Sequence, residues 1–218
     1  MNVVVIGANR GIGLEFCNQL AGEHKVFAFC RKASSELKDL NVKISENVEV
    51  SEPESLARAT EALEGEKIDY LIHVAGILQS QSLDNFDLAG VEKQFLVNSI
   101  APVLSVKAFL PYLNQGAKIA LLTSRMGSIA DNDSGGQYGY RMSKAALNAA
   151  GKSLAIDLKP KGYTVLLLHP GYVKTDMTGH NGLIECPESV QGMLQILKNK
   201  NIEDTGTFWH TNGEQLPW

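Results

Sequence analysis

The sequence is poor in cysteine, and its three cysteines, Cys17, Cys30 and Cys186, lie far apart along the chain. An odd number of cysteines without metal-ligand spacing argues against a disulfide framework and against a zinc site, and it favours a reducing compartment. The chain also lacks any run of Lys or Arg, and its formal net charge is -4. We therefore expect neither a metal nor a nucleic-acid partner.

No apolar run reaches the roughly 18 residues that a membrane-spanning helix needs. No signal-like segment precedes the first apolar run, because residues 1–6 already belong to a glycine motif. We therefore expect a cytosolic (cytoplasmic) protein with no membrane partner. The 218 residues contain no internal repeat and no linker rich in Gly, Ser or Pro, so we expect one domain over residues 1–218.

Short apolar runs rich in Val, Ile and Leu alternate with segments of helical period. The runs cover residues 2–8, 25–31, 69–76, 117–124 and 163–171, with weaker strand candidates at 47–52 and 206–210. Helices are predicted over residues 13–20, 54–63, 91–113 and 140–159. Such alternation is typical of a parallel sheet that is buried on both faces. The sequence therefore predicts an α/β fold, a single Rossmann-like doubly wound parallel sheet of about seven strands with helices on both faces.

The stretch VVVIGANRGIGLEF places Gly7, Gly11 and Gly13 between a predicted strand and a predicted helix. A strand that turns directly into a helix presents unpaired backbone N–H groups and the positive end of the helix dipole, which suit a phosphate. The spacing is Gly-x-x-x-Gly-x-Gly, and Phe16 stands where the common dinucleotide fingerprint has its last glycine. The pattern predicts a nucleotide site of a narrower family, and the alternative is a tight turn without a ligand.

The end of the second predicted strand indicates the type of dinucleotide. NAD sites place an Asp or Glu about 20 residues after the glycines, whereas the 2′-phosphate of NADP needs a cation. Here Arg31 follows Cys30 with no acid, and Arg10 offers a second cation beside the glycines. We therefore expect NADP(H) in preference to NAD(H). The alternative is that both arginines are solvated surface charges.

The segment YGYRMSKAALN places Tyr140 and Lys144 four residues apart, on one face of a predicted helix. A nearby ammonium favours the phenolate and lowers the pKa of a tyrosine, which then exchanges a proton with a carbonyl oxygen. Tyr138 lacks such a partner, because Met142 stands four residues after it. The pair alone is weak evidence of catalysis, since ordinary amphipathic helices also carry Tyr-x-x-x-Lys.

Two further polar residues belong to this candidate site. Ser124 ends a predicted strand, at the carboxyl edge where open α/β sheets bind ligands, and its hydroxyl is able to donate to the substrate oxygen. Thr123 and Ser128 are competing hydroxyls. Asn98 lies inside a predicted helix, where its amide either holds a water that leads to Lys144 or is satisfied locally.

Six motifs together resemble those of the short-chain dehydrogenase/reductase family, of the compact type: GANRGIG, HVAG, VNSIAP, LLTSRMGS, YGYRMSK and HPGYVKTDM. The resemblance covers nearly the whole chain, and SRMGSIAD, PGYVKTDM and the closing GEQLPW are similar to the sniffer, C-factor and carbonyl-reductase-like branch. It implies that Tyr140 is the acid/base and that Lys144 binds the ribose and lowers the tyrosine pKa. It also implies that Ser124 orients the carbonyl and that Asn98 supports a proton relay.

The resemblance further implies a set of cofactor contacts. The contacts in the stretch HPGYVKT would wrap the nicotinamide, and Glu49 and Val50 take the adenine-contact position. The complete set is Gly7, Asn9, Arg10, Gly11, Ile12, Gly13, Arg31, Glu49, Val50, Val74, Ala75, Gly76, Tyr140, Lys144, Pro170, Gly171, Val173 and Thr175.

Two positions depart from the family pattern. Ile6 replaces the threonine before the first glycine, so a supporting hydroxyl is missing, and HVAG replaces Asn-Asn-Ala-Gly. Neither position touches the chemistry in the family pattern, so we expect altered stability or cofactor affinity and not lost catalysis. His73 and His169 each close an apolar run and are expected to be satisfied structural residues and not bases.

These observations predict a reductase that uses NADPH to convert a small, mostly apolar aldehyde or ketone to an alcohol. One alternative is a cofactor-binding regulatory or signalling protein of the C-factor type, which a damaged catalytic set would indicate. Another is an epimerase or dehydratase of the extended branch, but its Gly-x-x-Gly-x-x-Gly spacing is absent. By resemblance, residues 91–113 and 140–159 would form the contact of a homodimer or homotetramer.

Overall fold

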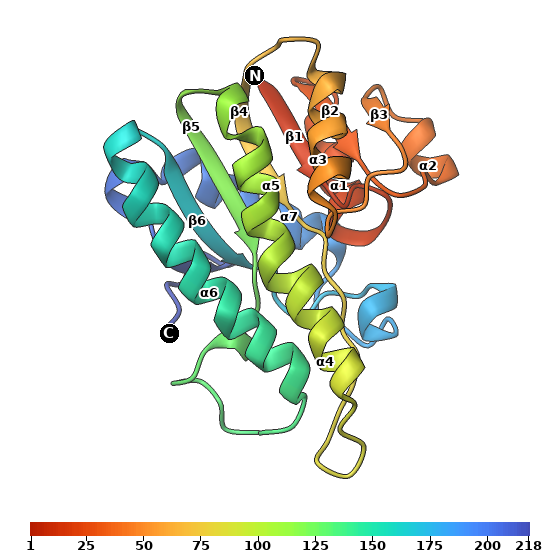
Figure 1. The fold of residues 1–218 in the computed structure, drawn as a ribbon, viewed down its shortest axis with the longest axis vertical. Helices are drawn as coiled ribbons and strands as arrows, with labels where there is room; N and C mark the ends of the chain where they lie inside the picture. The colour runs from red at the N-terminus through yellow and green to blue at the C-terminus, as the bar shows by residue number, and fades with distance from the viewer.

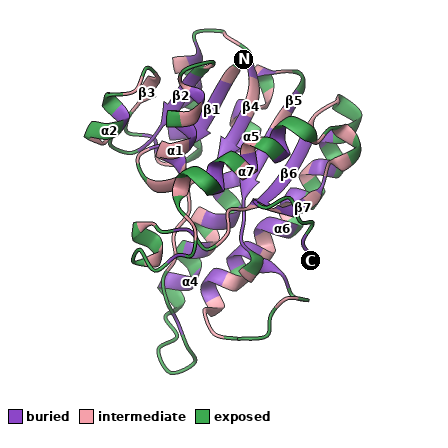
Figure 2. Ribbon diagram, turned by 180° about the vertical axis from the view of Figure 1, so that it is seen from behind, coloured by how far each residue is buried: buried purple, intermediate pink, exposed green.

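A computed structural model describes all 218 residues and contains one parallel sheet in the order β3-β2-β1-β4-β5-β6-β7. The seven strands are β1 (Asn2–Ile6), β2 (Lys25–Phe29), β3 (Lys43–Ser45), β4 (Ile68–His73), β5 (Leu113–Leu122), β6 (Thr164–His169) and β7 (Thr207–His210). One face is covered by α3 (Pro53–Thr60), α4 (Leu88–Phe95), α5 (Ala101–Phe109) and α6 (Tyr138–Leu158), as Figure 1 shows. The other face carries α1 (Gly11–Leu20) and α7 (Cys186–Asn199), with the short α2 (Ser35–Lys38) at its edge (Figure 2). The predicted doubly wound α/β architecture is confirmed.

The central strands are apolar on both sides because helices cover both faces of the sheet (Figure 2). In β1, Val4 and Ile6 join the core cluster under α3, α5 and α6, while Val3 and Val5 join the cluster under α1 and α7. All four side chains are fully buried. The unbroken apolar run in the sequence therefore reflects two separate cores, one on each side of the sheet.

Two predicted elements differ from the structure. Residues 47–52 are not a strand, and the third strand is β3 instead. Val48 and Val50 are nevertheless buried in the core near α3, and the Glu49 N–H donates to Ser55 Oγ at 2.9 Å. A loop thus produces the alternation of buried valines that resembles a strand. Helix α7 is absent from the predicted helices.

The predicted helix 91–113 is not one continuous α-helix. A π-helical turn, η2 (Leu96–Ile100), separates α4 from α5, and β5 already begins at Leu113. The helical segment Leu88–Tyr112 is long and apolar enough to cross a membrane by length and composition alone, contrary to expectation. Val106 and Phe109 of this segment pack in the core of the protein, and buried core helices meet the same criterion. The segment is therefore weak evidence of a membrane span.

The strand order reverses between β1 and β4, so the connections that leave these two strands diverge at their carboxyl ends. This is the point at which open α/β sheets bind ligands. After β1 the chain turns at Gly7, which has φ +91° and passes so close to β4 that a Cβ would lie 2.7 Å from the Ala75 nitrogen. A Cβ on Gly13 would lie 2.0 Å from the Gly7 carbonyl oxygen. The start of α1 therefore packs directly onto the turn, and only glycine fits there.

Replacing Gly13 with Ala is expected to destabilise the protein by about 2 kcal/mol or more, because the helix must move away from the Gly7 carbonyl. Urea denaturation measures the loss of unfolding free energy. Gly22→Ala is the matched control, since a Cβ at Gly22 meets nothing within 4 Å. Equal stabilities for the two variants would contradict the close packing.

Candidate active site

The turn between β1 and α1 holds the first group of predicted cofactor residues, Gly7, Asn9, Arg10, Gly11, Ile12 and Gly13. No side chain caps the amino end of α1, so the N–H groups of its first turn have no partner within the helix. The Oδ1 atom of Asn9 is buried and also lacks a hydrogen-bond partner. Free N–H groups and the positive end of the helix dipole suit an anion, and a partnerless buried amide indicates a missing ligand or water. These residues fit a dinucleotide phosphate.

The residues after β4 lie against this turn, as the sequence predicts. The N–H groups of Val74 and Ala75 donate to the Ile6 carbonyl at 2.9 and 3.1 Å. Gly76 follows, and a Cβ there would lie 3.3 Å from Asn98 Oδ1 and 3.7 Å from Lys144 Nζ. The end of β4 therefore connects the glycine turn to the candidate catalytic group.

The segment after β6 approaches the same turn from the other side. Thr175 Cγ2 would lie 3.4 Å from a Cβ on Gly11, and Gly171 has φ +84°. Ser189 Oγ donates to the Pro170 carbonyl at 2.6 Å, and Val173 is buried. The structure therefore places the predicted nicotinamide-contact segment beside the glycine turn.

The predicted cations differ in their surroundings. Arg10 forms an exposed ion pair with Asp176 at 2.9 Å, a partner that no local sequence pattern indicates. Arg31 follows β2, is exposed and has no ion-pair partner. Glu49 lies nearby in the loop before α3 and accepts a hydrogen bond from Ser51 Oγ at 2.9 Å, while Val50 is buried. Of the two predicted cations, Arg31 is thus the one without an ion-pair partner, and it is free to bind a phosphate at this edge of the sheet.

Tyr140, Lys144 and Ser124 come together at the carboxyl end of β5. Tyr140 is 8% exposed, Lys144 5% and Ser124 7%. Lys144 Nζ lies 5.8 Å from the centre of the Tyr140 ring and donates to the Leu122 carbonyl at 2.8 Å. Ser124 precedes the short helix η4 (Arg125–Gly127) and accepts from the Met126 N–H at 3.2 Å, and its hydroxyl acts to lower the pKa of the Tyr140 phenol. The grouping predicted from the Tyr-x-x-x-Lys spacing and the strand end is therefore present in the fold.

Burial dominates the electrostatics of this group. Burial raises the pKa of Tyr140, and the hydrogen bond with Ser124 acts in the opposite direction. The sequence predicts that the pKa of Tyr140 is lowered, whereas in the free protein this pKa is raised. Burial also lowers the pKa of Lys144 to about 8, because a low-dielectric site disfavours the ammonium. Burial of the phenol thus favours the protonated form of Tyr140.

Asn98 lies in the π-helical turn η2 and is fully buried. Its Oδ1 accepts from the Ile77 N–H at 2.8 Å, and its Nδ2 donates to the Ile77 carbonyl at 2.9 Å and to Ser143 Oγ at 3.0 Å. The amide therefore has protein partners at both its oxygen and its nitrogen, from segments 21 and 45 positions away in the sequence, and the predicted proton relay stays a prediction. Ser143 also donates to the Tyr140 carbonyl at 2.8 Å, so it connects η2 to α6. No spacing pattern in the sequence indicates this role for Ser143.

His73 is buried and His169 is half-buried, but neither is satisfied as expected. The His73 ring lies near the Ala75 backbone, yet neither ring nitrogen has a partner at hydrogen-bonding geometry. Nδ1 of His169 also lacks a partner, and its ring contacts His210 edge to face at 5.0 Å. Burial lowers the pKa of each histidine to about 3. Rings with such low pKa values are weak proton acceptors near pH 7, in agreement with the expectation that neither histidine is a base.

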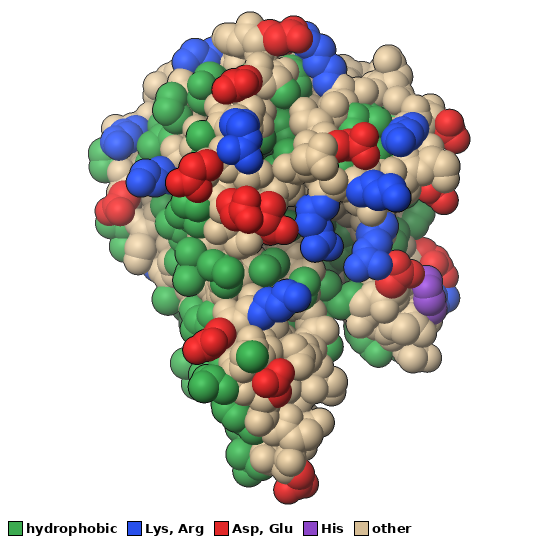
Figure 3. All heavy atoms as spheres, turned by 45° about the vertical axis from the view of Figure 1, so that its right-hand side comes forward, with side chains coloured by type: hydrophobic (Ala, Val, Ile, Leu, Met, Phe, Trp, Pro, Cys, Tyr) green, Lys and Arg blue, Asp and Glu red, His purple; other side chains and the backbone are tan.

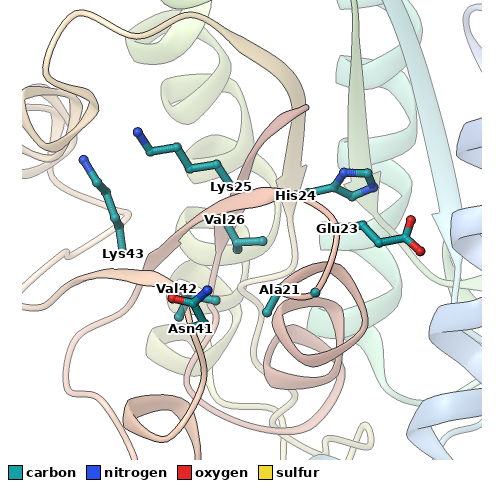
Figure 4. A pocket seen from close by; sticks show the side chains of 9 residues that line it. Ala21, Glu23, His24, Lys25, Val26, Asn41, Val42 and Lys43 are labelled. Carbon is teal, nitrogen blue, oxygen red and sulfur yellow. The ribbon is translucent and has the colours of Figure 1, made fainter.

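The surface near this edge is hollowed between the tapering end of the molecule and a smaller lobe beside it, and Lys and Arg side chains gather next to the hollow (Figure 3). Another pocket lies at the opposite edge of the sheet, lined by residues 21–26 and 41–43 around the amino end of β2 (Figure 4). Its cations are already paired, Lys25 with Glu66 and Lys43 with Glu64. We assign it no ligand, since none of the predicted site residues lies there.

Comparison with known proteins agrees with this geometry. Residues 1–183 match the family model of the short chain dehydrogenases. The chain is 37% identical over 226 residues to a 1-hydroxy-2-glutathionyl-2-methyl-3-butene dehydrogenase of Rhodococcus sp. (strain AD45), with 99% of each chain covered. It is 44% identical over 154 residues to the C-signal protein of Myxococcus xanthus, covering 69% of this chain and 93% of that one. The NADPH-bound carbonyl reductase from chicken fatty liver has the same fold, with a TM-score of 0.92, 34% identity and coverage of 100% and 98%.

The neutral buried histidines predict a loss of stability in acid. Above pH 6.5 His73 is neutral in both states, but between pH 6.5 and about 3 only the unfolded chain takes up the proton. The free energy of unfolding should therefore decrease as the pH is lowered through this window, by up to about 1.4 kcal/mol per pH unit for each such histidine. His73→Asn is expected to make this fall less steep. Urea denaturation at several pH values measures it, with the exposed His180→Asn as control; an unchanged slope in His73→Asn would contradict the assignment.

Proposed function

Since the chain belongs to the short-chain dehydrogenase family, we propose that it is an NADPH-dependent oxidoreductase that reduces an aldehyde or ketone to an alcohol. The observation that carries the proposal is the buried group of Ser124, Tyr140 and Lys144 at the ligand-binding edge of the sheet. The relatives support it: one is named a dehydrogenase and a structural neighbour is a carbonyl reductase.

Each residue of the group has a separate part in the proposed reaction. The nicotinamide, when bound, supplies the hydride that adds to the carbonyl carbon. Tyr140 donates its proton to the carbonyl oxygen as that oxygen gains charge, and Ser124 donates a hydrogen bond to the same atom. The raised pKa of Tyr140 favours this direction, because the phenol holds its proton at neutral pH. Carbonyl reduction uses this protonated phenol, whereas alcohol oxidation uses the phenolate.

Lys144 is the residue best suited to hold the ribose next to this phenol. An ammonium has three donors, and its only protein acceptor is the Leu122 carbonyl. The two remaining N–H groups suit the ribose hydroxyls, which would also restore the partners that burial has removed. Asn98 supports the arrangement by fixing η2 against α6 through Ser143.

The free cation at the end of β2 supports NADPH over NADH. Arg31 has no carboxylate partner and no acid directly follows β2 to receive ribose hydroxyls, and a guanidinium binds a phosphate with two parallel hydrogen bonds. Arg10 could contact the same phosphate only if it shared its guanidinium with Asp176 or broke its ion pair with that residue. The NADPH found in the chicken carbonyl reductase is consistent with this choice.

The loops after β5 and β6 support an apolar substrate. Ile129 and Leu183 are each 82% exposed, and Tyr172 and Met177 are also exposed. These side chains lie on the segments that follow Ser124 and the predicted nicotinamide contacts. A small apolar carbonyl compound is therefore the substrate class proposed, and it would bury these side chains.

A second candidate function is that of a cofactor-binding signalling protein, which the similarity to the C-signal protein favours. The presence of Ser124, Tyr140, Lys144 and Asn98 in one buried group favours the enzyme. The two functions differ in their dependence on Tyr140, because a signalling role that needs only the bound cofactor survives loss of the phenol.

Tyr140→Phe is expected to lower the rate of NADPH oxidation by a carbonyl substrate at least about 100-fold, because the proton donor is removed. NADPH binding, measured by its fluorescence, should be retained. Tyr138→Phe is the matched control and should keep full activity. A panel of aldehydes, ketones and one glutathione conjugate provides the substrates, and undiminished turnover by Tyr140→Phe on any of them would refute the assignment.

Arg31→Ala is expected to raise the Kd for NADPH about 10- to 100-fold and to leave the Kd for NADH within about twofold, since only NADPH carries the 2′-phosphate. Calorimetric titration with each nucleotide measures both constants. Lys32→Ala removes a neighbouring exposed cation and serves as the control. Equal losses of NADPH and NADH affinity in Arg31→Ala would argue against this phosphate contact.

A further inference from the structure

The chain adopts an unusual backbone immediately before the catalytic helix. Gly135, Gly136 and Gln137 have φ values of +63°, +62° and +50°, so three consecutive residues are left-handed. Glycine adopts this conformation freely, but Gln137 carries a Cβ and is strained there. Such strain persists only where surrounding contacts hold it, and it is frequent at functional sites.

Gln137 is held by the loop that follows β4. Its N–H donates to the Gln81 carbonyl at 2.8 Å, and its Oε1 accepts from the Gln81 N–H at 3.2 Å. Its Nε2 donates to Ser80 Oγ at 2.9 Å. Backbone and side chain of one residue thus join two loops that are 56 positions apart in the sequence. We call this junction of Ser80, Gln81 and Gln137 the glutamine latch.

The glutamine latch also contacts the first turn of α6. Gln81 is 3% exposed, and its Nε2 donates to the Asp87 carbonyl at 2.9 Å. A Cβ on Gly139 would lie 2.9 Å from Gln81 Oε1 and 2.5 Å from Nε2 of the buried Gln94. The helix therefore rests on two buried glutamine side chains one residue before Tyr140.

This contact matters because Tyr140 lies in the part of α6 that is least stable by itself. It is the third residue of the helix, whose amino end has no side-chain cap, and uncapped helix ends fray. The first helical hydrogen bond here runs from the Arg141 N–H to the Gln137 carbonyl at 2.9 Å. A change at Gln137 is therefore transmitted directly to the turn that carries the phenol.

We propose that the glutamine latch positions Tyr140 against Ser124, with Gln137 as its central residue. Gln137 is a positioning residue, since it acts through the helix and touches neither Tyr140's phenol nor a ligand in the contacts above. The catalytic part of this inference rests on the proposed function. Its structural part, that the latch holds the first turn of α6, is tested without any substrate.

Gln137→Gly separates positioning from stability. It removes both side-chain hydrogen bonds and also removes the left-handed strain, so Tm should stay within about 4 °C of the unaltered protein. We expect kcat to fall about 10- to 100-fold, because small displacements of a catalytic group are costly. The KM for NADPH should stay within about twofold, since the glycine turn is remote from the latch. Amide hydrogen exchange at residues 138–141, measured in the protein alone, should become at least about tenfold faster.

Two further variants make the test specific. Glu64→Gly is the matched control, because Glu64 is also left-handed (φ +53°) and also makes an exposed side-chain bond, to Lys43 at 2.8 Å. It should leave kcat unchanged. Gln137→Asn tolerates the left-handed backbone but is one methylene too short to keep both bonds, so it should lose kcat as Gln137→Gly does.

Unchanged kcat and exchange in Gln137→Gly would overturn the proposal. So would a full loss in Gln137→Gly with wild-type behaviour in Gln137→Asn, because chain flexibility would then be the cause. A fall in Tm that parallels the loss of kcat would assign the latch to folding stability alone. If the unaltered protein reduces no carbonyl compound, the proposed function fails, and the exchange rates at residues 138–141 still decide whether the latch holds the helix.

Discussion

A buried ammonium with too few acceptors is the constraint on which the rest of the site depends. Lys144 is almost fully buried, and a single backbone carbonyl at the end of β5 accepts from it. Burying a charge without enough partners is costly, which is why its pKa falls to about 8. The phenol of Tyr140, buried beside it, has its pKa raised by the same cause. In the free protein the proposed catalytic group thus lacks acceptors for Lys144, and the ribose hydroxyls of a dinucleotide are the acceptors that would complete it.

The parallel sheet explains how residues far apart in the sequence reach this ammonium. The carboxyl ends of β1, β4 and β5 lie along one edge of the sheet, and the segment after each strand contributes a different part of the site. The turn after β1 offers free N–H groups, the segment after β4 passes Asn98 and Lys144, and the loop after β5 carries Ser124. The close packing of Gly13 on the Gly7 carbonyl fixes the direction of α1. The position of the candidate phosphate site at the start of α1 therefore follows from the packing of this helix on the turn after β1.

Features that are local in the sequence could be predicted. Buried strands are apolar on both faces, so their runs stand out, and a Tyr-x-x-x-Lys spacing places both side chains on one face of α6. Strand β3 has only three residues, Lys43–Ser45, which leave no pattern, whereas Val48 and Val50 alternate like a strand because a loop buries them. Helix α7 does carry apolar residues at helical spacing, Val190, Met193 and Leu197, so the signal for it was present.

Contacts between distant segments could not be predicted. The Ser143 bond to Asn98 joins residues 45 positions apart, and the Arg10 ion pair with Asp176 spans 166 positions. The direction of the Tyr140 pKa was also beyond the sequence, because it depends on burial that only the fold determines. The polar contacts of a site are set by which loops meet, and a single sequence does not record this.

A crystal structure of the protein with NADP⁺ tests the central claim most directly. The account predicts that Lys144 Nζ keeps its bond to the Leu122 carbonyl and gains the ribose hydroxyls as acceptors, with the Tyr140 phenol facing the nicotinamide. A bound nucleotide whose ribose lies out of reach of Lys144, or whose phosphates lie away from the first turn of α1, would contradict it.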